Sequence, residues 1–325
     1  MIAAEQALMH QSPELKRAYA ACREIARREA KNFYYAFLAL PRHKGDAMCA
    51  VYAFMRRADD LADDEAMSIE ARRAAMAEWS AAWAQAQAGG PTDDPVFIAL
   101  LDTQRRFGIS DDLLRELVRG TAMDLDEEAT ARMQITTLPA MGPAGRQFAV
   151  YQTFNDLYEY CYLVASVVGL VCIRIFGYTD PRAEEFAEQT GIAFQLTNIL
   201  RDVREDADRG RIYLPVEDLE KFSVTVEELA LHRGKVITLN QRELLEFEAG
   251  RARDYYRASE ELLPLIDADS RAALWVLVTI YRTLLDRIED KSYDVFTRRV
   301  RVGTLTKIWI LLRGVLRAVF SRIRL

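Results

Sequence analysis

Two stretches of the sequence place acidic side chains four residues apart. Asp59 and Asp63 stand in RRADDLADD (56–64), and Asn198, Asp202 and Asp206 stand in NILRDVRED (198–206). On a helix this spacing brings the side chains to one face, where like charges weaken the helix by about 0.2–0.5 kcal/mol per pair. A bound cation would compensate. The oxygen-only ligand set, without His or Cys, favours Mg²⁺ or Mn²⁺ over zinc or copper.

A magnesium site of this kind indicates a phosphorylated ligand. Magnesium held by a few carboxylates usually completes its shell with water and substrate phosphates. The sequence contains neither GxxxxGK[ST] nor GxGxxG, the loops that cradle nucleotide phosphates, so a nucleotide is not expected. Two acidic helices beside an apolar cavity favour a diphosphate with a hydrocarbon tail. Metal, Arg and Tyr would make diphosphate a leaving group, and aromatic walls would shelter the carbocation from water.

The elements that position these residues are predicted to be helices. Of 325 residues half are hydrophobic and 28% charged, with only 15 Gly and 9 Pro, which indicates an all-α protein. Neither a repeat nor a linker divides the chain, so a single domain is expected. Apolar periodicity and turn residues predict helices at 13–38, 43–64, 66–88, 97–107, 111–126, 153–177, 181–210, 225–232, 240–262 and 266–291, with Asp111 or Asp112 as a cap and Gly210 as a stop. The segment 127–146 reads as a surface excursion, either a lid or a loop.

Composition excludes several classes of protein. The net charge of −6 and pI near 5.4 argue against a nucleic-acid surface. The cysteines form no CxxC pair and have apolar neighbours, which predicts reduced thiols and favours the cytoplasm; they are Cys22, Cys49, Cys161 and Cys172. No signal peptide is recognisable, and charges are expected to interrupt every apolar run before the ~20 residues of a membrane span.

The last segment, 304–325, differs from the expected domain at 1–303. It carries no acidic residue, and its basic residues are Lys307, Arg313, Arg317, Arg322 and Arg324. Its apolar residues follow helical spacing, a pattern typical of a helix that lies in an anionic membrane interface. We therefore expect peripheral contact with the inner face of the membrane; the alternative is an ordinary terminal helix packed on the domain.

Four motifs carry a family resemblance. NFYYAFLALP, AVYAFMRRADDLADD, DLYEYCYLVASVVG and QLTNILRDVREDADRGRIYLP resemble, in order, the signatures of the squalene/phytoene synthase family of head-to-head prenyl synthases. The likeness runs from about Ala30 to about Val302. It implies an all-α, single-domain isoprenoid synthase fold with helices around a central apolar cavity.

The resemblance also implies roles for individual residues. Asp59 and Asp63, which we call the first acidic ladder, and Asn198, Asp202 and Asp206, the second, would bind Mg²⁺. Tyr160 would contact the carbocation or the released diphosphate. The positions implied to bind substrate are Phe33, Tyr52, Arg56, Val164, Val168, Gly169, Gln195, Arg201, Tyr213, Tyr281 and Arg298, the last chosen over its neighbour Arg299. One departure is Asn32, preceded by Lys31, where the family usually has Ser; an amide there can still hydrogen-bond.

The implied activity is Mg²⁺-dependent condensation of two prenyl diphosphates. We expect farnesyl diphosphate to give presqualene diphosphate or squalene, with phytoene from geranylgeranyl diphosphate as the alternative. NADPH would be needed only for squalene, and other enzymes of isoprenoid biosynthesis are the expected partners. A terpene cyclase or head-to-tail prenyltransferase would also use Asp-rich helices with Mg²⁺, but it fits the third and fourth motifs poorly. A non-catalytic assembly subunit would be expected to have lost the carboxylates.

Overall fold

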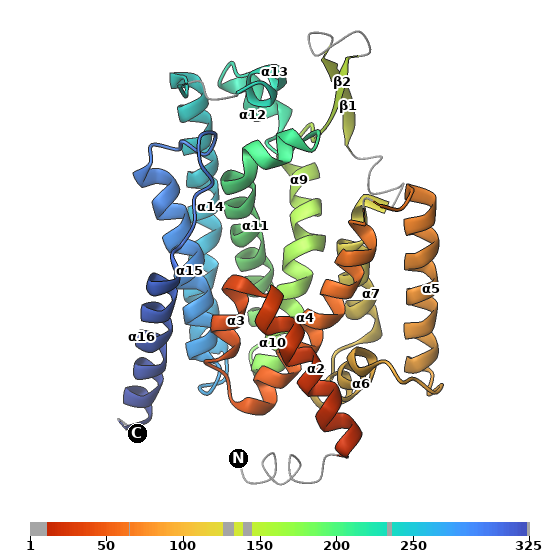
Figure 1. Cartoon of the computed structure of the whole chain (residues 1–325). Helices are drawn as coiled ribbons and strands as arrows, with labels where there is room; N and C mark the ends of the chain where they lie inside the picture. Colours follow the sequence, from red (N-terminus) through yellow and green to blue (C-terminus); the bar gives the residue numbers. More distant parts are fainter. Residues whose placement is uncertain (1–11, 65, 126–132, 139–144, 233–235, 324–325) are drawn as a thin grey trace.

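Long helices make up most of the molecule (Figure 1). The computed structural model describes residues 12–64, 66–125, 133–138, 145–232 and 236–323, apart from the side chains of 31, 32, 124 and 318–323. The helices are α2 (Pro13–Glu29), α3 (Lys31–Phe37), α4 (Arg42–Ala62), α5 (Ile69–Gln87), α6 (Pro95–Phe107), α7 (Asp111–Thr121), α9 (Phe154–Cys161), α10 (Val167–Phe176), α11 (Arg182–Asp208), α12 (Val216–Lys221), α13 (Val226–Ala230), α14 (Leu239–Leu265), α15 (Arg271–Asp290) and α16 (Thr304–Ile323). A 3₁₀ turn, η1 (Met123–Leu125), and a π-helix, η3 (Tyr162–Ser166), complete the helical part. The all-α prediction is confirmed.

Helix boundaries follow local side-chain chemistry. The Ser110 hydroxyl accepts the backbone N–H of Leu113 and caps α7, so the cap predicted at Asp111 or Asp112 was one or two residues late. Both carboxylates stand instead in the first turn, where the positive end of the helix dipole favours them. Gly210 follows α11 with a φ of 80°, as expected of a residue that ends a helix at little steric cost.

A small sheet was not predicted. Strand β1 (Gln134–Leu138) pairs antiparallel with β2 (Arg146–Val150), and β2 pairs parallel with β3 (Arg211–Ile212), directly after α11. The expected excursion at 127–146 therefore holds β1 and the start of β2. Residues 126–132 and 139–144 are outside the described part of the chain, so the choice between lid and loop stays a prediction.

The run α9–η3–α10 lies in the middle of the helices (Figure 1). In the part of the chain that the structure describes, Phe154–Phe176 is the one helical run long and apolar enough to cross a membrane by length and composition. Sequence patterning predicted no such run. Within it only Asn155 and Arg174 are exposed, and α11 packs along it. These contacts make it a core helix.

At the end of α4 away from its acidic residues, a buried lysine joins three segments of the chain. The Lys44 Nζ donates to the Phe176 carbonyl at 2.7 Å, to Asp269 at 2.7 Å and to the Ser270 hydroxyl at 3.0 Å. Three partners satisfy a buried ammonium group that would otherwise be costly. The bonds tie the start of α4 to the end of α10 and to the turn before α15.

Candidate active site

A cavity of about 800 Å³ lies among the helices. Its charged end includes Arg56 and Asp59 on α4 and Asn198 and Arg201 on α11. On α11 the lining continues from Asn198 back to Ala187, a length of about 16 Å at 1.5 Å per residue. The wall along this length is mainly apolar, with Phe37, Met48, Val51, Phe176, Leu262, Leu274 and Leu277 among its residues. The cavity therefore suits a molecule with a charged head and a long hydrocarbon tail.

A second cavity, of about 260 Å³, adjoins the first. Asp59, Val164 and Val168 line both cavities, while Asp63 and Tyr160 line only the smaller one. The first acidic ladder thus stands on the boundary between the two spaces.

The first ladder ends α4. Asp59 is in the last turn and Asp63 is the C-cap residue, where the negative end of the helix dipole opposes a carboxylate. Burial raises the pKa of Asp59 to about 7; Arg56 opposes that rise, while Asp63 and Asp60 add to it. The side chains around Asp59 therefore supply too little positive charge to balance its ionised carboxylate.

In the second ladder, Asn198 and Asp206 likewise have too little positive charge or too few hydrogen-bond donors around them. Asn198 Oδ1 is buried and has no hydrogen-bond partner in the described structure, although its amide nitrogen donates to Gln195 at 3.3 Å. Burial, followed by the charge of Asp202, raises the pKa of Asp206 to about 7. An orphaned buried oxygen costs free energy, so both positions favour a cation.

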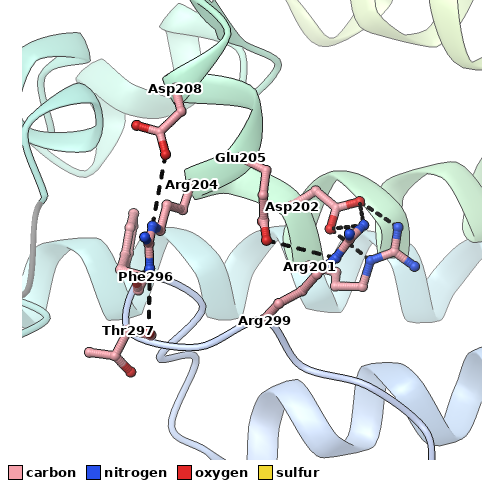
Figure 2. Close-up of polar contacts among 8 residues, drawn as sticks. All are labelled: Arg201, Asp202, Arg204, Glu205, Asp208, Phe296, Thr297 and Arg299. Atoms are coloured by element: carbon pink, nitrogen blue, oxygen red, sulfur yellow. Dashed lines mark hydrogen bonds and ion pairs between the residues drawn. The ribbon is translucent and has the colours of Figure 1, made fainter.

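Asp202, the middle of the ladder, is held by two arginines (Figure 2). The neighbouring Arg201 donates from Nε at 2.8 Å and also pairs through Nη2. Arg299 reaches the same carboxylate from the segment before α16, at 2.8 Å, and lies 3.8 Å from Glu205. A ligand that binds Arg201 and Arg299 would free the Asp202 carboxylate from these ion pairs.

The donor set fits a shared magnesium site rather than a closed protein site. Among the described residues no group of three or more His, Cys, Asp or Glu side chains is close enough to hold a metal ion. Mg²⁺ is usually bound by one or two carboxylates together with water and substrate phosphates. Two separated ladders, each with an under-neutralised oxygen, match that mode of binding.

Arg299, not Arg298, reaches the cavity. Arg299 lines the larger cavity, whereas Arg298 is not among the lining residues. The register is set by Arg204, whose Nη1 donates to the carbonyls of Phe296 at 3.1 Å and Thr297 at 3.4 Å (Figure 2). These bonds fix the segment across α11 with Arg299 at the cavity, and a substrate contact by Arg298 stays a prediction.

Aromatic side chains border both cavities. The Tyr160 hydroxyl donates to the Tyr213 hydroxyl at 3.2 Å, and burial raises the pKa of Tyr160 well above its ordinary value, so its hydroxyl keeps its proton. In the larger cavity the Tyr281 ring stacks on Phe194 at 4.5 Å and lies 6.0 Å from Phe33. Ring faces at these positions suit a transient carbocation.

Most of the predicted residues come together. The larger cavity is lined by Phe33, Tyr52, Arg56, Asp59, Val164, Val168, Gly169, Gln195, Asn198, Arg201 and Tyr281. Asp202 stands behind this lining and accepts a hydrogen bond from Arg201, and the charge of Asp202 acts on Asp206 in turn. Tyr213 is bonded to Tyr160, which lines the smaller cavity. The side chains of Lys31 and Asn32 are outside the described part. Phe194 was missed, although it precedes Asn198 by one helical turn and so shares its face.

The sequence model of the squalene/phytoene synthase family matches residues 26–306. A 15-cis-phytoene synthase from Synechococcus elongatus is 36% identical over 316 residues, with 94% of each chain covered. A phytoene synthase from Mycobacterium tuberculosis is 34% identical over 299 residues, which covers 90% of this chain and 89% of the relative.

Two solved structures are similar in fold and sequence. A dehydrosqualene synthase in complex with a ligand superposes with a TM-score of 0.78 at 32% identity, covering 95% of this chain and 98% of that one. A squalene synthase from Alicyclobacillus acidocaldarius gives a TM-score of 0.73 at 27% identity, covering 87% and 97%.

Proposed function

The chain belongs to the squalene/phytoene synthase family, and we propose that it joins two molecules of geranylgeranyl diphosphate to give phytoene. Family membership makes it a prenyltransferase that condenses prenyl diphosphates head to head. The choice of substrate rests on relatives at 34–36% identity that are named phytoene synthases. The sequence-based preference for farnesyl diphosphate is less well supported than its alternative.

The observation that carries the proposed chemistry is the polarity of the larger cavity. Its charged end offers Arg56, Arg201 and Arg299, and its long wall is mainly apolar. Guanidinium groups bind phosphate oxygens through strong charge-assisted hydrogen bonds. A prenyl diphosphate would therefore enter with its head at this end and its tail along α11.

We propose Mg²⁺ as the metal, with Mn²⁺ as a substitute, held by Asp59, Asp63, Asn198, Asp202 and Asp206. When bound, the metal would neutralise diphosphate and make it a better leaving group. Support comes from the orphaned Asn198 oxygen and from the raised pKa of Asp59 and of Asp206.

The residues of the chain account for the rest of the reaction. One substrate ionises while the arginines hold its diphosphate, and the C2–C3 double bond of the second substrate attacks the cationic C1. Loss of a proton gives a cyclopropylcarbinyl diphosphate. This ionises, rearranges beside the rings of Phe194 and Tyr281, and loses a second proton to give the C40 hydrocarbon. Two diphosphates and two protons are released and no reductant is consumed, so NADPH is not required.

The test is an incubation of purified protein with Mg²⁺ and either geranylgeranyl or farnesyl diphosphate, each with and without NADPH. Mass analysis of the extracted lipids should find a C40 product that is unaffected by NADPH. A C30 product formed faster than any C40 product would overturn the choice of substrate. Product from neither substrate would revive the non-catalytic alternative.

A further inference from the structure

The outward face of α16 carries an unusual concentration of exposed apolar side chains. Six of the eleven large apolar side chains that are exposed in the described residues lie on this one helix: Leu305, Ile308, Trp309, Leu312, Val315 and Leu316. The exposed fraction is 83% for Leu305, 57% for Trp309 and 58% for Leu312. Their spacing of three and four residues places them in one stripe, which we call the α16 stripe.

The opposite face of α16 is fixed to the body of the protein. Ile310 is buried in the main hydrophobic cluster. At Gly314 a β-carbon would lie 2.6 Å from Val276 Cγ2, so the helix backbone packs directly on α15. Figure 1 shows α16 along the outer edge of the bundle, beside α15. The α16 stripe therefore stays exposed because the helix cannot turn it inward.

Basic residues accompany the stripe. Helix α16 contains no acidic residue, and Arg313 and Arg317 are exposed. The Arg313 guanidinium lies 5.1 Å from the Trp309 ring and that of Arg317 lies 4.7 Å from the Trp275 ring. An apolar face flanked by arginines is complementary to a surface with an apolar interior and anionic head groups.

The larger cavity reaches the surface at the start of the same helix. Gly303, Thr304 and Lys307 line it, and Gly303 and Thr304 are exposed. The first turn of α16 thus borders both the cavity and the α16 stripe. Long prenyl substrates and a water-insoluble hydrocarbon product would gain from an opening at a lipid surface.

We propose that the α16 stripe docks on the surface of an anionic lipid bilayer and brings the opening of the cavity to the membrane. A second copy of the chain fits less well. A two-fold contact is formed by the same patch on both partners, so the arginines of one stripe would face those of the other, and like charges brought together oppose association. The argument from lipid substrates rests on the proposed function, whereas the stripe and its charge do not.

The experiment is flotation of the full chain with phosphatidylcholine vesicles that either contain or lack phosphatidylglycerol. We expect binding to the anionic vesicles and much weaker binding to the neutral ones. The double change Trp309→Ser and Leu312→Ser removes two large exposed anchors and should reduce bound protein by at least about tenfold. Leu239→Ser, which removes an apolar side chain of similar exposure on α14, should leave binding unchanged.

Turnover in detergent solution separates this inference from the proposed function. The double variant should keep its turnover there within about twofold, since exposed substitutions seldom disturb the fold. The inference is overturned if the unchanged protein does not float with anionic vesicles, or if the double variant floats equally well. It is also overturned if the stripe mediates a dimer on size exclusion that the double change dissociates.

Discussion

Gly191 on α11 touches the π-helix so closely that its lack of a side chain is required. A β-carbon at Gly191 would lie 2.6 Å from Ser166 Cα, 2.8 Å from Ser166 N and 3.0 Å from Ala165 C. All three are backbone atoms of η3, so no rotamer change can relieve the overlap. Val164, from the same turn, lines both cavities, and a shift of η3 would therefore change the site as well.

The free energy of Gly191→Ala has two opposing parts. Overpacking a well-filled interior costs about 1–3 kcal/mol. Because the atoms that a β-carbon would meet here are rigid backbone atoms, we take a cost of about 3 kcal/mol. Alanine is favoured over glycine within a helix by about 1 kcal/mol. The net expected destabilisation is about 2 kcal/mol. Gly250→Ala on α14 is the matched control, because a β-carbon there meets nothing within 4 Å, and it should stabilise the protein by about 1 kcal/mol.

Urea unfolding measures the difference between the two variants. The expected gap of about 3 kcal/mol separates their midpoints by about 1 M if the m value is about 3 kcal/mol per molar. Both substitutions change the same residue type within a helix, so the gap isolates the contact with η3. Equal midpoints for the two variants would refute the close packing of α11 on the π-helix.

Three further outcomes follow from the site and the core. Arg299→Gln should raise KM for the prenyl diphosphate by about tenfold, the value of one charge-assisted contact. Arg298→Gln should change KM by less than about twofold. Equal effects of the two variants in steady-state kinetics would contradict the preference for Arg299. Asp59→Asn should reduce product formation by at least about 100-fold without lowering the urea midpoint, because the carboxyl group is desolvated; retained turnover would contradict the metal assignment. Burial raises the pKa of Glu248 above its ordinary 4.5 although Arg251 opposes the rise, so between pH 4.5 and the raised pKa the folded state holds a proton that the unfolded chain has lost. The contribution of this group to stability is complete below pH 4.5 and is lost as pH rises through the raised pKa, and Glu248→Gln should flatten that fall in pH-dependent unfolding; an unchanged slope would contradict it.

The sequence predicted the helices well because their signals are local. The long helix α4 carries strong apolar periodicity, and Gly210 ends α11 through its own backbone freedom. The acidic ladders could be placed on one face by spacing alone. The cavity around them follows because the helices that bear the ladders bury their remaining apolar faces together.

Features that depend on contacts between distant segments were not predictable. The strands β1 and β2 are five residues each, too short for a clear alternating pattern, and β3 becomes a strand only through its pairing with β2. The choice between Arg298 and Arg299 depends on two bonds from Arg204, which no spacing rule reveals. The π-helix η3 lies where Gly191 on α11 and Gly120 on α7 allow both helices to approach its backbone closely.

A competition between the two prenyl diphosphates tests directly which of them the enzyme condenses. Purified protein receives equal amounts of geranylgeranyl and farnesyl diphosphate with Mg²⁺ and no NADPH, and the extracted hydrocarbons are separated by mass. We expect a C40 hydrocarbon to dominate and chelation of the metal to abolish its formation. A dominant C30 product, or a C40 product that persists after chelation, would contradict this expectation.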